Sequence, residues 1–341
     1  MRIILDTMGS DNGAEEFVKA ALLAIEELDI DIVLVGCEDE LKALLEKHDK
    51  DKLYEKNITI LPTSEVVTME DDPVAVIKQK PDSSMLKALR YLADNKGDAV
   101  VSAGNTGALL TMATLVVKRI KGIRRAALAP VVPTANGCAI LIDSGANVDC
   151  TPEYLYQFAL MGSFYAENAL GIKKTRVGLL NNGTESHKGD DLHREAYKLL
   201  TEAHENKKIN FVGNIEGRDG PLGAADVIVA DGFSGNIYLK TMEGVGLFFS
   251  REIKKMFMSS KRGKVSGLML KRKIGEFKSK IDYNEAGGAP LLGVRKPVIK
   301  AHGSAKATAL CNAIVQAIDY IDSGMTIKLS NTLGGGEQSE E

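Results

Sequence analysis

The turn at residues 102–107 combines residue types that bind an anion with a position where backbone donors converge. An apolar run precedes it and predicts a short strand, and the nearly charge-free run after it predicts a helix. Free N–H groups and the positive end of a helix dipole would then point at one spot that suits phosphate. Gly104 and Gly107 permit close backbone approach, while Asn105 and Thr106 can cap the helix or bind the ligand. The alternative is an ordinary strand–helix turn whose glycines serve geometry alone.

Similar loops follow several other predicted strands. They consist mostly of Gly, Asn, Ser, Thr and Asp, and at least four strand ends carry such a loop. They lie at residues 7–13, 143–147, 181–189 and 231–236. Because ligands of parallel α/β sheets bind at the carboxyl ends of the strands, these loops predict a shared cleft with close backbone approach and neutral hydrogen bonding.

The composition is typical of a soluble globular protein, with 341 residues, 44% hydrophobic and 26% charged. No apolar run is long enough to span a bilayer, and the N-terminus is typical of a strand rather than a secretion signal. The four cysteines are scattered, which favours reduced thiols in the cytosol and argues against a zinc site. Aromatic residues make up only 5%, so we expect neither base-stacking surfaces nor a nucleic-acid partner.

Strand-like and helix-like segments alternate along the chain, which predicts an α/β fold with a mostly parallel sheet and helices on both faces. Strands are expected at 2–6, 32–35, 58–61, 99–101, 176–180 and 226–230, and helices at 14–28, 39–47, 85–95, 152–170 and 190–204. Two β-rich runs, 126–132 and 138–143, predict an antiparallel hairpin. We expect a single domain over residues 1–330 and a disordered tail at 331–341.

Residues 251–280 carry eleven Lys or Arg and two Glu, a net charge of +9 in a chain whose total is −3. Apolar residues at helical spacing flank a loop expected at 259–267, which predicts a basic helical hairpin over about 245–285. Three interpretations stay open: a dimer arm, a contact with anionic lipid, and a docking surface for an acidic protein. Nucleic acid is disfavoured because the rest of the chain is acidic.

Seven segments, taken together and in order, resemble the bacterial phosphate acyltransferase family of the PlsX type. They are DTMGSD, SAGNTGALL, LIDSGANVDC, NNGTESHKG, VGNIEGRD, ADGFSGNIYLKTMEG and GAPLLGVRKPVIKAHGSAKA. They extend from Asp6 to Lys306, nearly the whole chain. No single segment is decisive, but the set is specific.

The resemblance implies a three-layer α/β/α sandwich similar to phosphate acetyltransferases and isocitrate dehydrogenase-like enzymes. It implies reversible transfer of a long-chain acyl group from acyl carrier protein to orthophosphate, which forms acyl phosphate for phospholipid synthesis. It also implies a cytoplasmic homodimer without metal or cofactor that associates peripherally with the anionic membrane. The membrane glycerol-3-phosphate acyltransferase is a candidate partner.

This chemistry needs an anion cradle, an oxyanion donor and room for an acyl chain, because phosphate must attack a thioester carbonyl. Phosphate is substantially dianionic near neutrality, and a thiolate with a pKa of about 8–9 leaves readily. Positioning and charge neutralisation can therefore supply most of the effect, and no covalent enzyme intermediate is required.

Lys188 is assigned to holding phosphate and stabilising developing charge, because its loop contains no other Lys or Arg. Asn182, Gly183 and Thr184 would add amide and side-chain donors from the same loop. The alternative for Lys188 is a solvated surface lysine.

Asp231, Ser234 and Asn236 are expected on the facing wall of the cleft. Either Asn236 or the amides at Gly232 and Gly235 would stabilise the oxyanion. Asp231 could instead cap the helix that follows it.

Asn105, Thr106 and Gly107 complete the predicted phosphate site, and His302 and Ser304 are further candidates. For His302 a structural role is favoured, because a lone histidine after a strand often forms local hydrogen bonds. Two other histidines are expected to be exposed: His187 and His193.

Three other functions compete with acyl carrier protein-dependent transfer. A short-chain phosphate acyltransferase would use coenzyme A, and a dehydrogenase-like enzyme would need a dinucleotide motif that we do not find. In a non-catalytic membrane adaptor, the basic hairpin would be the whole function.

An apolar groove for an acyl chain is expected near Phe248, Phe249 and residues 291–292.

Overall fold

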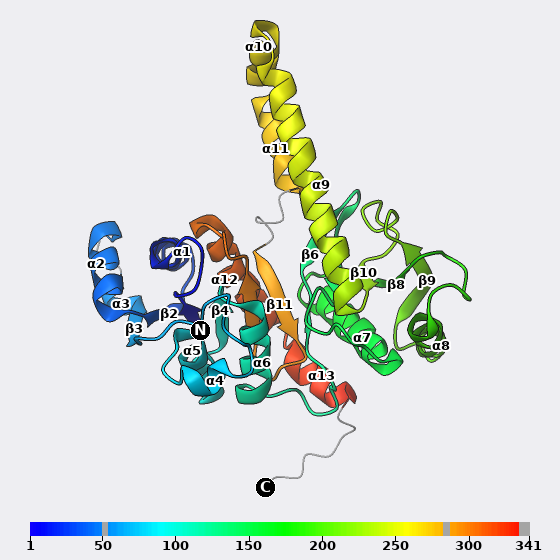
Figure 1. Ribbon diagram of the computed structural model, residues 1–341, viewed down its shortest axis with the longest axis horizontal. Coiled ribbons are helices and arrows are strands. Elements are labelled where there is room, and N and C mark those ends of the chain that lie inside the picture. The colour runs from blue at the N-terminus through cyan, green and yellow to red at the C-terminus, as the bar shows by residue number, and fades with distance from the viewer. Residues whose placement is uncertain (50–53, 282–286, 334–341) are drawn as a thin grey trace.

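The computed structural model describes residues 1–49, 54–281 and 287–333. Their strands form two mostly parallel sheets covered by helices, and a long helical arm projects from the molecule (Figure 1). The predicted α/β class and the helical layers are confirmed. The strands are divided between two sheets rather than collected in one.

The first sheet has the strand order β3-β2-β1-β4-β12-β11-β5. Its strands are β1 (Arg2–Asp6), β2 (Asp31–Gly36), β3 (Ile58–Pro62), β4 (Ala99–Ser102), β5 (Ala127–Leu128), β11 (Gly288–Leu292) and β12 (Val298–Ala301). Neighbours are parallel except at β11, which is antiparallel to β12 and β5. The carboxyl ends of β1, β4 and β12 therefore lie at the same edge.

The second sheet has the order β6-β7-β10-β8-β9. Its strands are β6 (Val131–Thr134), β7 (Gly137–Ile142), β8 (Arg176–Asn181), β9 (Asn210–Glu216) and β10 (Val227–Val229). β6 and β7 form the predicted antiparallel hairpin, in which Thr134 pairs with Gly137. The other pairs are parallel, so the loops after β7, β8 and β10 share one edge.

Helices cover both faces of the first sheet because successive strand residues point to opposite sides. Ile3 and Leu5 pack in one cluster with α1 (Ala14–Glu27) and α12 (Ala307–Asp322). Ile4 packs in another with α5 (Ser84–Ala93) and α6 (Thr106–Val116). Three further helices follow β2 and β3: α2 (Glu38–His48), α3 (Tyr54–Asn57) and α4 (Val76–Gln79).

The second sheet is covered by α7 (Pro152–Asn168) and α8 (Asp191–Glu205) on one face and by the start of α9 (Gly232–Met258) on the other. One buried cluster runs from α12 into α7, where the rings of Tyr165 and Tyr320 meet edge to face at 5.6 Å. One buried cluster is thus shared by both sheets. The single domain over residues 1–330 stays a prediction.

The arm consists of α9, α10 (Lys261–Met269) and α11 (Lys271–Ile281), with α10 at its tip (Figure 1). The prediction of a loop at 259–267 is wrong, because most of that segment is α10. The Ser260 hydroxyl accepts the Gly263 N–H at 3.0 Å and caps this helix. Across the chain that the structure describes, no helix is long and apolar enough to cross a bilayer.

The last helix is α13 (Met325–Leu333). Residues 331–333, predicted to belong to a disordered tail, are therefore helical. The remainder of that predicted tail, 334–341, lies outside the described residues.

Replacing Gly235 by Ala is expected to lower the free energy of unfolding by about 1–3 kcal/mol. An added Cβ would lie 1.9 Å from the carbonyl oxygen of Asp143, so the first turn of α9 would have to move away from the loop after β7. Gly244 lies in the same helix with no atom within 4 Å of its added Cβ. Gly244→Ala should raise the free energy of unfolding by up to about 1 kcal/mol, because alanine favours helix. Equal changes in urea unfolding for the two variants would contradict this account.

Candidate functional site

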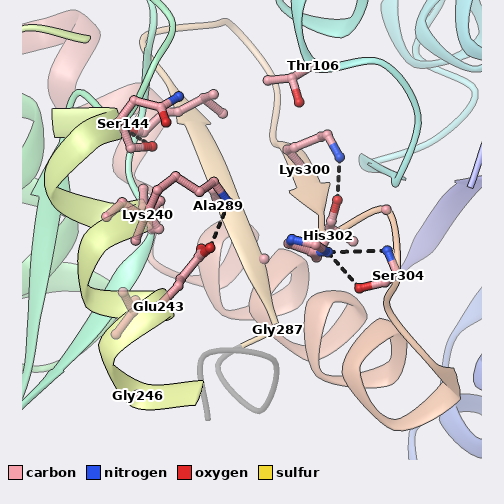
Figure 2. Close-up of a pocket in the computed structure, with 18 of the residues that line it drawn as sticks. Thr106, Ser144, Lys240, Glu243, Gly246, Gly287, Ala289, Lys300, His302 and Ser304 are labelled. Atoms are coloured by element: carbon pink, nitrogen blue, oxygen red, sulfur yellow. Dashed lines mark hydrogen bonds and ion pairs between the residues drawn. The ribbon is translucent and has the colours of Figure 1, made fainter. Parts of the chain in front are cut away.

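A cavity of about 700 Å³ is lined by residues from both sheets. One wall comes from the loop after β1, the turn after β4 and the end of β12. The other comes from the loop after β7 and from α9, and Figure 2 shows side chains of both walls pointing into the space between them. The shared cleft predicted from the strand-end loops is thus present, although only some of those loops reach it.

The structure brings four of the predicted site residues to this cavity. Thr106 and Ser304 contribute hydroxyl groups and His302 an imidazole (Figure 2). Asn236 contributes an amide. These four residues come from three separate stretches of chain: the start of α6, α9, and the loop after β12. The remaining predicted residues do not line the cavity.

Two lysines that the sequence-based prediction omits lie in the cavity wall, Lys240 and Lys300. The Lys240 ammonium pairs with Glu243 Oε2 at 2.7 Å, one turn further along α9. Lys300 is half-buried in β12, and its ammonium donates to the carbonyl oxygens of Ala103, at 3.2 Å, and Ala301. In the sequence, the feature that could have identified Lys300 is its position as a lysine within an otherwise apolar strand.

Burial lowers the pKa of Lys300 to about 8. The negative charges of Asp6 and Asp11 act in the opposite direction, whereas Lys240 acts in the same direction as burial. The ammonium is therefore still largely charged at neutral pH, and it can lose its proton in mildly alkaline solution.

His302 is held by local hydrogen bonds, as the structural alternative proposed, and it also faces the cavity. Its Nδ1 accepts the Ser304 N–H at 3.2 Å and lies 2.9 Å from the Ser304 hydroxyl (Figure 2). Burial lowers the pKa of His302, and the Lys240 charge adds to this effect. The imidazole is therefore neutral at pH 7, with its proton on Nε2, because Nδ1 accepts the amide hydrogen.

The second wall is held in place by Asp143, a fully buried residue at the end of β7. Its carboxylate accepts the backbone N–H groups of Leu128, Gly145, Ala146 and Asn147 and the side-chain amide of Asn147, at 2.6–3.3 Å. These donors shape the loop at residues 143–147. The Asn236 amide lies against that loop, since a Cβ at Gly145 would be 2.7 Å from Asn236 Nδ2.

The amides predicted to bind an oxyanion are already engaged. The Gly232 N–H donates to the Asn147 carbonyl at 2.7 Å, and the Gly235 N–H donates to the Asp231 carbonyl at 2.9 Å. Ser234 also lies away from the cavity, in a neighbouring apolar groove of about 880 Å³. Of this group, the side chain of Asn236 alone reaches the cavity wall.

Asn105 has the capping role that the sequence left open. Its Oδ1 accepts the Ala108 N–H at 3.0 Å, and its Nδ2 donates to the carbonyl of Thr68 at 3.1 Å. Gly107 packs against Pro73, because an added Cβ would lie 2.9 Å from that ring. Within the predicted phosphate turn, Thr106 therefore faces the cavity while its neighbours position it.

Lys188 lies in the loop after β8, outside the cavity wall, with Asn182, Gly183 and Thr184. Its aliphatic stem covers Gly183, where an added Cβ would lie 2.9 Å from Lys188 Cγ. Lys188 is half-buried, and in the described parts of the chain its ammonium has no ion pair or hydrogen bond among those found. Asn182 and Thr184 are exposed.

Asp231 caps α9, since its carboxylate accepts the N–H groups of Phe233 and Ser234, both at 2.9 Å. His193, predicted to be exposed, has only 13% of its side chain exposed. Its Nδ1 lies 2.6 Å from Asp190, and its Nε2 lies 4.0 Å from Asp231. His193 thus lies between the start of α8 and the start of α9. His187 is exposed, as predicted.

Two further chemistries find little support in the structure. Within residues 1–49, 54–281 and 287–333, no group of three His, Cys, Asp or Glu side chains is placed to hold a metal ion. Burial raises the pKa of the Cys150 thiol to about 12, which disfavours a thiolate nucleophile there.

Solved structures share the fold. A phosphotransacetylase from Streptococcus pyogenes is 17% identical with a TM-score of 0.61, and the match covers 96% of this chain and 94% of that one. The EutD phosphotransacetylase from Staphylococcus aureus is 16% identical with a TM-score of 0.58 and the same coverage. A 4-hydroxythreonine-4-phosphate dehydrogenase from Klebsiella pneumoniae is 14% identical with a TM-score of 0.54, covering 94% of this chain and 99% of that one. At these identities the likeness shows the fold alone.

The sequence comparisons are closer. A family model described as "Fatty acid synthesis protein" matches residues 1–328. The phosphate acyltransferase of Clostridium acetobutylicum is 45% identical over 334 residues, 98% of this chain and 99% of that protein. The phosphate acyltransferase of Caldanaerobacter subterraneus is 44% identical over 342 residues, 99% of this chain and all of that protein. This chain therefore belongs to the PlsX family of phosphate acyltransferases.

Proposed function

We propose that this acyltransferase moves a long-chain acyl group from acyl carrier protein to orthophosphate. A phosphate oxygen attacks the thioester carbonyl carbon, the new C–O bond gives acyl phosphate, and the C–S bond breaks to release the carrier thiolate, which takes a proton from solvent. The observation that carries the proposal is the meeting of Lys300, Lys240, His302 and Asn236 around one cavity. No enzyme nucleophile is needed.

The phosphate is held between the two lysines. Lys300 is fixed by two carbonyl oxygens, which leaves a third N–H for a ligand. Lys240 can turn from Glu243 toward a dianion, and neutral His302 can donate from Nε2. These donors neutralise charge without reorganising at the moment of attack, which is the main electrostatic contribution to acyl transfer.

Asn236 stabilises the oxyanion through its side-chain amide. It lies across the cavity from the β12 residues and rests on Gly145, so its position is set by the loop that Asp143 shapes. Removing one such donor typically slows acyl transfer by about 10²–10³-fold.

Lys188 completes the charge neutralisation from the loop after β8. Its ammonium is available to a ligand, and His193, which follows this loop, lies 4.0 Å from Asp231 at the base of α9. Catalytic contacts often tighten only when substrate binds, so a position beside the cavity is compatible with this role.

The acyl chain follows α9. Leu247 and Ser250 line both the cavity and an apolar groove of about 680 Å³ within the arm. The groove walls include Ile253, Phe257 and Leu268. The acyl chain does not bind near residues 291–292, where a groove was expected, because Leu291 and Leu292 are buried in the core. Phe249 lines the other apolar groove, which Ser234 also lines.

The arm carries the remaining proposed contacts. Exposed apolar residues on α9 form a homodimer interface, and the basic residues receive acidic acyl carrier protein. The tip meets anionic lipid, because Leu268 and Met269 are 73% and 82% exposed beside lysines of α10. The enzyme is thus cytoplasmic and peripherally membrane-associated, close to the membrane glycerol-3-phosphate acyltransferase that receives its product.

The proposed donor is tested by mixing the protein with palmitoyl-acyl carrier protein and phosphate. Acyl phosphate and free carrier thiol should appear in equal amounts and only when phosphate is present. Turnover with acyl-coenzyme A but not with acyl carrier protein would instead identify a coenzyme A-dependent enzyme. If neither donor gives acyl phosphate, the result would favour the membrane-adaptor function.

Lys188→Ala is expected to lower kcat/KM for phosphate about 100-fold, a loss of roughly 2.7 kcal/mol of transition-state stabilisation. Lys198→Ala is the matched control, because Lys198 is 69% exposed on α8 and pairs only with Glu195 among the ion pairs found. Initial rates at varied phosphate measure both variants. Normal turnover in Lys188→Ala would end the assignment.

The double variant Leu268→Ser/Met269→Ser should lose about tenfold or more of its binding to phosphatidylglycerol vesicles, because it removes two exposed apolar side chains. Co-sedimentation measures the bound fraction. Leu222→Ser is the control, since Leu222 is comparably exposed but lies outside the arm. Unchanged binding in the double variant would show that the tip does not contact lipid.

A further inference from the structure

Three polar side chains form a row across the first sheet beneath the cavity. Asp6 of β1 is in register with Ser102 of β4, and Ser102 is in register with Lys300 of β12. Residues opposite each other on adjacent strands point to the same face. The row therefore places a carboxylate, a hydroxyl and an ammonium side by side where the strands end.

Burial raises the pKa of Asp6, whereas the hydrogen bond from Ser102 and the charge of Lys300 act in the opposite direction and favour its ionised form. Ser102 Oγ accepts the Gly104 N–H at 3.2 Å and lies 2.6 Å from Asp6 Oδ2. The serine proton then points to Asp6, and this distance is typical of a hydroxyl that donates to a charged carboxylate. Asp6 is fully buried, and its Oδ1 has no hydrogen-bond partner within the described residues. A buried carboxylate of this kind requires a nearby positive charge.

Lys300 supplies that charge from the other end of the row. Its ammonium donates to the Ala103 carbonyl. The next residue of the same turn, Gly104, donates its N–H to Ser102, which in turn contacts Asp6. The turn that presents Thr106 is thus held from both sides by one pair of opposite charges.

Four other groups complete the charge environment of Lys300. Asp11 in the loop after β1 is exposed, Lys240 of α9 is paired with Glu243, and His302 follows on β12. Asp6 is the one buried carboxylate among these described neighbours. Burial disfavours the charged form of a lysine, so the field of Asp6 is what opposes deprotonation most directly.

We propose that Asp6 is the counter-charge that keeps Lys300 protonated, and that this pair sets the upper pH limit at which the cavity accepts a dianion. Asp6 touches no substrate and is a positioning residue. The inference rests on the proposed function for the identity of the dianion, but the pair itself can be tested without turnover.

The direct test follows the titration of Lys300 by NMR in protein labelled with ¹³C at lysine Cε, with the signal assigned by its absence in Lys300→Met. The wild-type pKa should lie near 8. In Asp6→Asn it should fall by about one unit or more, because the carboxylate no longer favours the charged form. Asp98→Asn is the control, since Asp98 is an exposed carboxylate just before β4. An unchanged Lys300 pKa in Asp6→Asn would overturn the proposal.

Anion binding gives a second readout. Sulfate is the probe, because it stays dianionic across the range and does not add a titration of its own, as phosphate does. Sulfate binds the protonated form of Lys300, so affinity should fall as pH rises through the pKa. In Asp6→Asn the loss of affinity begins at a lower pH. A pKa lower by one unit should reduce the affinity at pH 8 about fivefold, while the affinity at pH 6 stays the same or rises. Loss of affinity at both pH values would indicate a damaged site and contradict the proposal.

If Asp6→Asn folds poorly, a double-mutant cycle replaces it. Removing one partner of a buried pair is costly, whereas removing both leaves no unpaired charge. Asp6→Asn/Lys300→Met should therefore recover thermal stability relative to Asp6→Asn, and additive losses of Tm would overturn the pairing. The two proposals can fail separately. If the enzyme does not turn over acyl carrier protein but Asp6→Asn still lowers the pKa of Lys300, the result contradicts the proposed function and leaves the Asp6–Lys300 pair standing.

Discussion

The carboxylate of Asp143 is the interaction on which the second wall of the cavity depends. A buried carboxylate must be satisfied by donors, and five N–H groups from two segments converge on it. That convergence shapes the loop after β7, which in turn receives the base of α9. Gly232 and Gly235 then permit the contact, because a side chain at either would overlap the backbone of this loop. The position of Asn236 therefore depends on Asp143, through the loop after β7 and the base of α9.

Much of this arrangement could be predicted from the sequence. Strand-end loops rich in small polar residues indicated a cleft, and their order along the chain indicated a family. Periodicity also placed most helices and strands within a few residues. These features are local, because they depend on which residue types follow an apolar run and not on what that run later meets.

What the sequence could not supply was the relation between segments that are distant along the chain. Lys300 follows Asp6 by almost the whole length of the chain, and only the order β1-β4-β12 puts them in one row. The division into two sheets also depends on long-range pairing. The α10 helix was missed for a different reason, since its serines and glycines favour a loop locally and a cap at Ser260 reverses that preference.

The length of α9 has a mechanical consequence. Its 27 residues form one continuous helix of about 40 Å, which Asp231 caps at its base. Asn236, Lys240, Glu243 and Leu247 share one stripe of this helix and line the cavity. The helix therefore acts as a lever, because a tilt of about 5° at its base moves the tip by roughly 3 Å. Whatever restrains the tip also restrains the orientation of the stripe that faces the reacting groups.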